Sequence, residues 1–166
     1  MVKINLGCGS KKLDGYLNVD VCGNPDLECD LSKVPWPFDD SSVDEITSEH
    51  FLEHVTDFEQ TVLEMHRILK VGGILHFKVP HFKSPAAAWH LHHHQFSTIT
   101  CGLLCDQRDY LWNGRKLFAK RALRINFVYL RPIINRILSL FANLSPSKWE
   151  YLGFPIDEIE FWAQKV

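Results

Sequence analysis

The chain has 166 residues, 46% of them hydrophobic, which is enough for one compact domain with a sizeable core and too little for two ordinary domains. Its 18 Lys and Arg residues nearly balance its 20 Asp and Glu residues, so the formal net charge is −2. This charge provides no general attraction for a polyanion, and nucleic acid is not an expected partner. We therefore expect a single domain spanning residues 1–166.

The N-terminal segment MVKINLGCGS has no apolar stretch long enough for a signal peptide, and nowhere does the chain carry 18 consecutive apolar residues. A cytoplasmic protein is therefore expected, and binding to a membrane surface is not. The five cysteines are an odd number without CxxC spacing. They favour free thiols over disulfides or a structural zinc site.

Four short segments rich in β-forming residues predict strands at 2–6, 16–20, 43–48 and 74–79. Between the last two, apolar residues recur at spacings of three and four and predict a helix closed by Gly72-Gly73. These residues are Val55, Phe58, Val62, Met65 and Leu69. The strand–helix–strand order predicts a βαβ unit and a parallel sheet.

The other segments predict a short strand near 27–29, a helix near 97–110, a strand around 125–130, a helix over 132–144 and a final strand over 157–166. The apolar stripe of the helix at 132–144 is typical of core packing or of a subunit contact, so a homo-oligomer is one expected form. The alternative for this stripe is a membrane-surface helix.

A glycine turn, Gly7-Cys8-Gly9, directly follows the first strand and lets the backbone approach a ligand closely. Asp20 ends the second strand, where a carboxylate can accept both hydroxyls of a ribose, and Asp30-Leu31 follows the third strand, where an adenine would lie. A dinucleotide fingerprint needs a third glycine where this chain has Lys12, which disfavours a nicotinamide-dependent oxidoreductase.

Together with later motifs, this segment resembles the class I S-adenosylmethionine-dependent methyltransferases, specifically the type 11 group in a minimal form. The resemblance covers about residues 2–80. It is carried by NLGCG, the strand-ending Asp20, CDL at 29–31, LEH at 52–54, and RILKVGG before a strand that ends in proline.

The resemblance implies an α/β fold with a Rossmann-like, mostly parallel sheet and an antiparallel last strand. It also implies S-adenosylmethionine as cofactor. Carried over by position, Gly7, Cys8 and Gly9 would line the methionine end. Asp20 would bind the ribose, Val21 would form a wall of the site, Asp30 and Leu31 would contact the adenine, and Glu49 would lie near the methionine moiety.

The chain departs from the family between its first two strands, because Gly7 to Gly15 are too few for the usual helix. The predicted strands also alternate apolar and polar residues, whereas strands covered on both faces are apolar throughout. We therefore expect one face of the sheet to lack a helix. Its polar side chains, Lys3, Asn5, His76 and Lys78, are expected to be largely exposed to solvent.

The pattern His50-x-x-Glu53-His54 places two histidines four residues apart, a spacing that suits a divalent metal. Metal-free relatives share this pattern, so no metal is expected. The histidine-rich segment 89–95 follows the fifth predicted strand, where this fold places acceptor-binding loops. It is either a source of a general base or weak metal site, or a solvated loop.

The sequence thus predicts S-adenosylmethionine-dependent methyl transfer to a small-molecule or sugar acceptor, with no catalytic base assigned. The alternative is a catalytically silent protein that keeps the cofactor-binding fold as a scaffold or partner.

Overall fold

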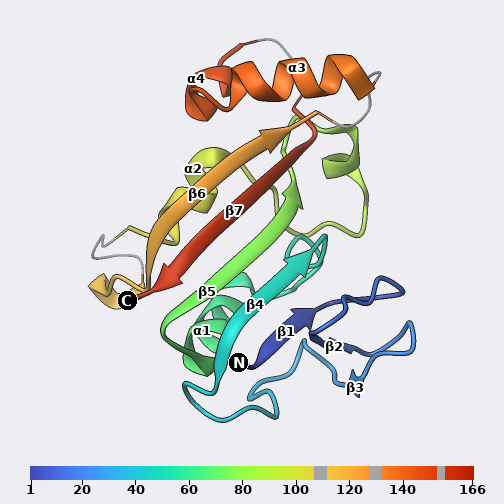
Figure 1. Cartoon of the computed structure of the whole chain (residues 1–166), viewed down its shortest axis with the longest axis vertical. Helices are drawn as coiled ribbons and strands as arrows, with labels where there is room; N and C mark the ends of the chain where they lie inside the picture. Colours follow the sequence, from blue (N-terminus) through green and yellow to red (C-terminus); the bar gives the residue numbers. More distant parts are fainter. Residues whose placement is uncertain (107–111, 128–131, 153–155) are drawn as a thin grey trace.

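A computed structural model of the chain describes residues 1–106, 112–127, 132–152 and 156–166. Their strands form one seven-stranded sheet in the order β3-β2-β1-β4-β5-β7-β6 (Figure 1). The strands are β1 (Lys3–Leu6), β2 (Leu17–Asp20), β3 (Leu27–Glu28), β4 (Val43–Glu49), β5 (Leu69–Pro80), β6 (Phe118–Asn126) and β7 (Glu158–Lys165). Strand β7 runs antiparallel to both of its neighbours, β5 and β6, and the other neighbouring pairs are parallel. The predicted α/β fold is confirmed.

The connection from β1 to β2 contains no helix, as expected from its length. Its loop packs directly on the sheet through a buried pair of asparagines, Asn5 and Asn18. The amide of Asn5 donates to Asn18 Oδ1 at 2.9 Å and to the carbonyl of Lys11 at 3.1 Å, while Leu13 N donates to Asn18 Oδ1 at 2.8 Å. These bonds replace the packing that a crossover helix would supply.

Helix α1 (Phe58–Ile68) begins at Asp57, whose side chain caps the helix by accepting from Gln60 N at 2.9 Å. The prediction that the helix ends at Gly72-Gly73 is wrong. The chain enters β5 at Leu69, which pairs with Val43, and both glycines lie inside that strand at a register shift. A Cβ on Gly73 would lie 2.8 Å from the carbonyl oxygen of Lys70, so the shift requires a close approach of backbone.

The second half of the chain differs more from the predictions. Helix α2 (Thr98–Leu103) is shorter than the predicted 97–110, although residues 107–110 lie outside the described part of the chain. Strand β6 begins at Phe118, well before the predicted 125–130, of which 128–130 are not described. Two short helical turns, Pro85–Ala88 and Trp112–Gly114, were not predicted.

Two further helices follow β6: α3 (Pro132–Ala142) and α4 (Pro146–Glu150). Helix α3 forms where it was predicted, and Leu138 of its apolar stripe packs against the core, but most of the stripe does not. Its large apolar side chains are exposed: Ile133, Ile134, Ile137, Leu140 and Phe141. A subunit contact therefore remains a prediction for this stripe. Among the described residues, no helix combines the length and apolar character needed to cross a bilayer.

The two faces of the sheet differ in chemistry. Helices α1 and α2 lie behind the sheet in Figure 1, where β1, β4, β5 and β7 present alternate apolar side chains to the core. No helix of the described ranges covers the front face (Figure 1). The expectation of one helix-free face is confirmed.

The prediction that the polar side chains of that face are largely exposed to solvent is wrong. The side chains of Lys3, His76 and Lys78 are only 31%, 20% and 28% exposed, because carboxylates on neighbouring strands lie against them. Asn5 is 4% exposed, since the loop after β1 lies over it. Ion pairs and a loop thus cover much of what a helix would otherwise cover.

A buried carboxylate connects the second-half elements. Glu150 of α4 accepts from Thr98 Oγ1 at 2.6 Å and also from Thr98 N at the start of α2. Its Oε1 lies 2.9 Å from Nε2 of His81, which follows β5 and is fully buried. Burial lowers the pKa of His81, so this imidazole is neutral at pH 7 and donates its Nε2 proton to the carboxylate.

Glu150→Ala should lower the free energy of unfolding by about 1 to 3 kcal/mol for each buried donor left without an acceptor. Urea unfolding measures the change. Lys148→Ala, on an exposed position of the same helix, is the matched control and should change stability little. Equal stabilities of the two variants would contradict this role of Glu150.

His66 on α1 packs edge-on against the buried ring of Phe118, with ring centres 5.4 Å apart. Burial, and then the nearby charges of Lys165 and Arg115, lower the pKa of His66 to about 4. The neutral imidazole is therefore the form that joins α1 to β6.

Stability should fall as the pH is lowered from about 6.5 to 4, because the unfolded chain binds a proton there that folded His66 does not. His66→Gln should lose less stability over this window than the wild type, and the exposed-site control His90→Gln should follow the wild type. Urea unfolding across the pH range tests this. The prediction fails if the His66→Gln and wild-type curves stay parallel.

Candidate functional site

The residues predicted to bind the cofactor come together at one edge of the sheet. Gly7 follows β1, Asp20 ends β2, Asp30 follows β3 and Glu49 ends β4. These strands are parallel and lie side by side, so their carboxyl ends meet at the same edge.

The glycine turn needs its glycines. Gly7 has a φ of +67°, and a Cβ there would lie 2.5 Å from the side chain of Phe51. Gly9 also has a positive φ, of +50°. Sequence reasoning missed Gly23, where a Cβ would lie 1.9 Å from the carbonyl oxygen of Gly9. The loop after β2 therefore approaches the turn backbone to backbone.

Asp20 holds this arrangement through backbone amides. Its Oδ2 accepts from Gly9 N at 2.7 Å, and its Oδ1 accepts from Val21 N at 2.7 Å and Cys22 N at 3.3 Å. A carboxylate has about four acceptor sites, so it can take a further hydroxyl donor. Val21 is 56% exposed and lies beside the carboxylate at the surface.

Asp30 and Leu31 differ from each other in burial. Asp30 accepts from Ser32 Oγ at 2.6 Å and pairs with Lys33 at 2.9 Å, and these partners lower its pKa to about 2. Leu31 is buried in the core, and its carbonyl accepts from Trp36 Nε1 at 3.2 Å. Leu31 therefore offers a ligand its backbone amide more readily than its side chain.

An ion pair lies across the glycine turn. Lys11 Nζ is 2.5 Å from Glu49 Oε2, and both residues line a cavity of about 20 Å³. The cavity is also lined by Asn5, Gly7, Cys8 and Leu13. Cys8 is buried, and burial raises the pKa of its thiol, so it is not a thiolate at pH 7. Because this space holds about one water, a larger ligand must displace the Lys11 side chain.

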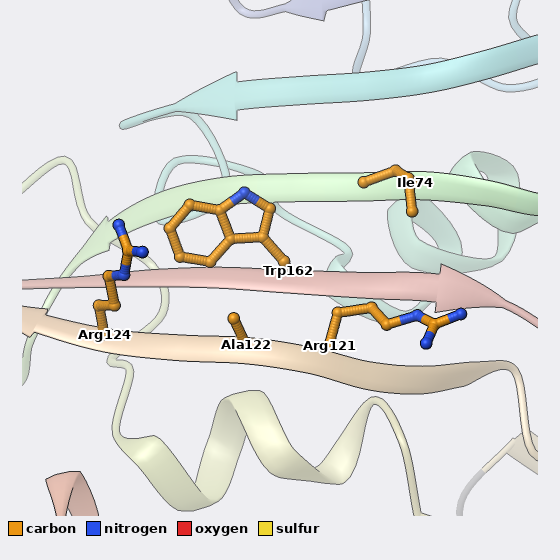
Figure 2. A pocket seen from close by; sticks show the side chains of 5 residues that line it. All are labelled: Ile74, Arg121, Ala122, Arg124 and Trp162. Atoms are coloured by element: carbon orange, nitrogen blue, oxygen red, sulfur yellow. The ribbon is translucent and has the colours of Figure 1, made fainter. Parts of the chain in front are cut away.

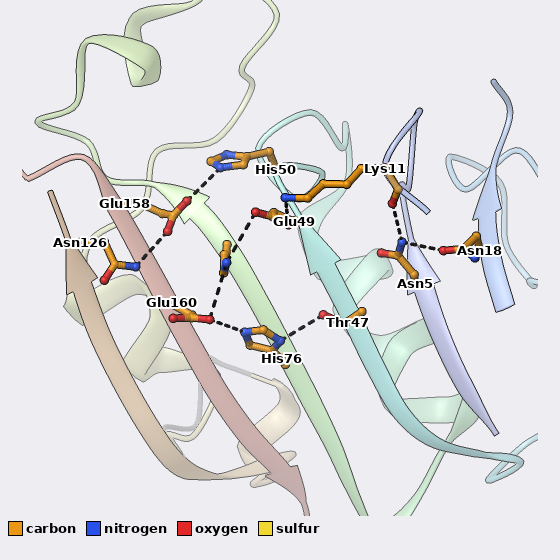
Figure 3. Close-up of polar contacts among 11 residues, drawn as sticks. Asn5, Lys11, Asn18, Thr47, Glu49, His50, His76, Asn126, Glu158 and Glu160 are labelled. Atoms are coloured by element: carbon orange, nitrogen blue, oxygen red, sulfur yellow. Dashed lines mark hydrogen bonds and ion pairs between the residues drawn. The ribbon is translucent and has the colours of Figure 1, made fainter. Parts of the chain in front are cut away.

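Polar contacts continue across the helix-free face (Figure 3). His76 lies 3.0 Å from Thr47 Oγ1 and 3.0 Å from Glu160 Oε1, while Lys78 Nζ is 3.5 Å from Glu49. Beside this network is a hollow of about 240 Å³. It is lined by Asn5, Leu13, Tyr16, Thr47, Ser48, Glu49, His76 and Lys78.

His50 marks the end of this network next to β7. Its two ring nitrogens lie 3.2 Å from Glu53 Oε1 and 3.1 Å from Glu158 Oε2. The hydrogen bonds to Glu158 and then Glu53 raise the pKa of His50 to about 9. His50 is therefore an imidazolium at neutral pH, which makes it a poor general base.

A second hollow, of about 380 Å³, lies on β6 and β7 (Figure 2). Trp162 forms its floor, stacked on His76 with ring centres 4.6 Å apart, and the guanidinium of Arg124 lies 5.1 Å from the Trp162 ring centre. Ile74, another lining residue, is far from the carboxyl end of β5. This hollow is therefore separate from the glycine turn.

In the part of the chain that the structure describes, two groups of three side chains bring metal-ligand atoms within 4.8 Å of one another: Glu49, His50 and Glu158, and Glu53, His54 and His92. The first group joins the ends of β4 and β7. The second group brings Glu53 and His54, the last two residues of the HxxEH motif, close to His92 in the histidine-rich segment after β5.

Comparison with known proteins agrees with this geometry. Residues 4–77 match the model of the methyltransferase domain family. No curated protein sequence matches the chain.

Among solved structures, the chain is similar to a possible histamine N-methyltransferase from Thermotoga maritima, with 16% identity and a TM-score of 0.64 over 99% of this chain and 82% of the other. It is similar to an S-adenosylmethionine-dependent methyltransferase from Mesorhizobium loti, with 18% identity and a TM-score of 0.58 over 99% and 90%. The chain is also similar to phosphoethanolamine N-methyltransferase 2 from Haemonchus contortus, whose structure was determined with S-adenosylmethionine. The identity is 16% and the TM-score is 0.59, over 99% of this chain and 48% of the other.

The fold is thus that of the class I S-adenosylmethionine-dependent methyltransferases. Residues 4–77, which match the methyltransferase domain family, include most of the segment that carries the motifs of the type 11 group. The family match and the neighbouring structures support S-adenosylmethionine as the cofactor.

Proposed function

We propose that this chain transfers a methyl group from S-adenosylmethionine to a small-molecule or sugar acceptor. The observation that carries the proposal is Asp20, which ends β2 and joins the glycine turn to the next loop by accepting from Gly9 N and Val21 N. A carboxylate held there is preorganised to accept ribose hydroxyls. When bound, the cofactor supplies an electrophilic methyl group.

The other contacts to S-adenosylmethionine are assigned from the position of each residue along the sheet edge. Gly7, Cys8 and Gly9 bind the methionine end through their backbone, and Val21 forms an outer wall beside the ribose. Asp30 and the amide of Leu31 meet the adenine. This assignment agrees with the order β3-β2-β1-β4 along the edge.

Lys11 and Glu49 recognise the two charges of the methionine moiety. An α-amino acid carries a carboxylate and an ammonium close together, and the Lys11–Glu49 pair carries the complementary charges. We infer that the pair separates around the zwitterion, with Lys11 on the carboxylate and Glu49 on the ammonium. Opening an exposed ion pair costs little, because such pairs contribute about 0 to 1 kcal/mol.

The acceptor is a small molecule or a sugar, because a net charge of −2 does not favour a polyanion. Methyl transfer depends largely on holding the nucleophile in line with the sulfonium. Formation of S-adenosylhomocysteine on a panel of hydroxyl and amine acceptors tests the activity. Cofactor binding without turnover on the whole panel would favour a catalytically silent scaffold instead.

Asp20→Asn should weaken S-adenosylmethionine binding by about 1.5 to 3 kcal/mol, because a charge-assisted hydrogen bond to the ribose is lost. Calorimetric titration measures the affinity, and circular dichroism checks the fold. Asp14→Asn makes the same change at an exposed position of the preceding loop and should bind like the wild type. Unchanged affinity in a folded Asp20→Asn protein would rule out the ribose assignment.

Lys11→Ala should weaken S-adenosylhomocysteine binding but leave 5′-methylthioadenosine binding unchanged, since only the first ligand carries the amino acid group. The two titrations are compared on the same protein. Lys12→Ala, which removes the neighbouring lysine paired with Asp26, is the control. A parallel loss for both ligands would show that Lys11 supports the loop and does not recognise the zwitterion.

A further inference from the structure

A cluster of potential metal ligands lies at the β5 side of the same sheet edge. Glu53 and His54 follow β4, and His92 follows β5, with one ligand atom of each within 4.8 Å of the other two. Because β4 and β5 are parallel neighbours, both segments leave the sheet at the same end. None of the contacts proposed above for S-adenosylmethionine uses these three side chains.

Two of the three side chains hold buried polar atoms without partners. Glu53 is 1% exposed, and its Oε1 faces His50 at 3.2 Å. Among the described residues, neither Glu53 Oε2 nor His92 Nδ1 has a hydrogen-bond partner, although both atoms are buried. Buried polar atoms are nearly always satisfied, so an orphaned carboxylate oxygen and an orphaned imidazole nitrogen on residues of the same cluster indicate a missing ligand.

The surrounding contacts orient the cluster. His93 N donates to the carbonyl of Glu53 at 2.7 Å, which holds the histidine-rich segment against the turn after β4. His54 Nδ1 lies 3.1 Å from the carbonyl of Leu91. A carbonyl only accepts, so Nδ1 carries the proton and Nε2 keeps the lone pair that binds a metal.

The neighbouring group of Glu49, His50 and Glu158 lacks this character. Glu49 is paired with Lys11 and Lys78, and Glu158 accepts from Asn126 at 2.9 Å. His50 already bridges two carboxylates. The ligand atoms of this group therefore already have partners within the protein.

We propose that Glu53, His54 and His92 bind a divalent transition-metal ion, with Zn²⁺ as the ion to be tested. Two imidazoles and one carboxylate are a donor set that suits zinc, and three protein ligands leave a fourth position open. The ligand atoms of one zinc ion lie about 3.4 Å apart. Side-chain rotations that move each ligand atom by about 1 Å would therefore bring the three atoms to this spacing. The sequence favoured no metal because metal-free relatives share the HxxEH motif.

Calorimetric titration of untagged protein with Zn²⁺ tests the proposal. Wild type should bind one equivalent, and His92→Ala and His54→Ala should each weaken that binding at least about tenfold. His93→Ala, which removes an exposed histidine next to the cluster, should bind like the wild type, and so should Glu158→Gln, which disables the neighbouring group. No saturable binding by the wild type, or equal affinity in the wild type and both ligand variants, would overturn the proposal.

Substitution with Co²⁺ provides a second readout that does not depend on methyl transfer. A site of nitrogen and oxygen ligands gives visible d–d bands without a thiolate charge-transfer band. The Co²⁺ protein should show d–d bands and no thiolate charge-transfer band, and His92→Ala should abolish the d–d bands. A thiolate band would place the ion at a cysteine and contradict the assignment.

Discussion

A sheet that carries helices on one face only must satisfy its other face with polar groups, and most features of this chain follow from that constraint. Lysines buried without partners would carry a large desolvation cost. Here each is matched by a carboxylate on the next strand, as Lys3 is by Glu45 at 2.7 Å. Because the face supports itself in this way, the connection from β1 to β2 needs no helix, and the glycine turn can lead almost directly into Asp20.

The sequence predicted elements well where the local pattern agrees with tertiary pairing. The alternating residues of β1, β2 and β5 predicted both the strands and the face that stays polar. Leu69 shows where local pattern fails, because it continues the apolar stripe of α1 and yet pairs with Val43 in the sheet. In β6 a register shift between Lys120 and Ala122 interrupts the alternation, and the consecutive residues Lys120 and Arg121 are both exposed. The stripe of α3 predicted a helix, but amphipathicity says which residues share a face and not what covers it.

The candidate site was predictable in so far as it depends on chain order. Asp20, Asp30 and Glu49 end or follow parallel strands, so their common edge follows from the topology. Lys11 and Gly23 were missed as site residues because their contacts depend on how loops fold over the sheet. His92 lies in segment 89–95, which was a candidate source of a general base or weak metal site, but its approach to Glu53 also depends on loop folding. No periodicity in the sequence reports the approach of Gly23 to Gly9, or that of His92 to Glu53.

The place of β7 in the sheet has a consequence for the order in which the protein can assemble. This strand lies between β5 and β6, and the ammonium of Lys165 donates to the carbonyl of Leu69 at the point where α1 becomes β5. On the ribosome, β1 to β5 can pair before residues 158–165 have been made, whereas β6 has no neighbour until then. The nascent chain therefore exposes two unpaired strand edges late in synthesis, at β5 and β6, which makes a stalled or truncated product prone to aggregation.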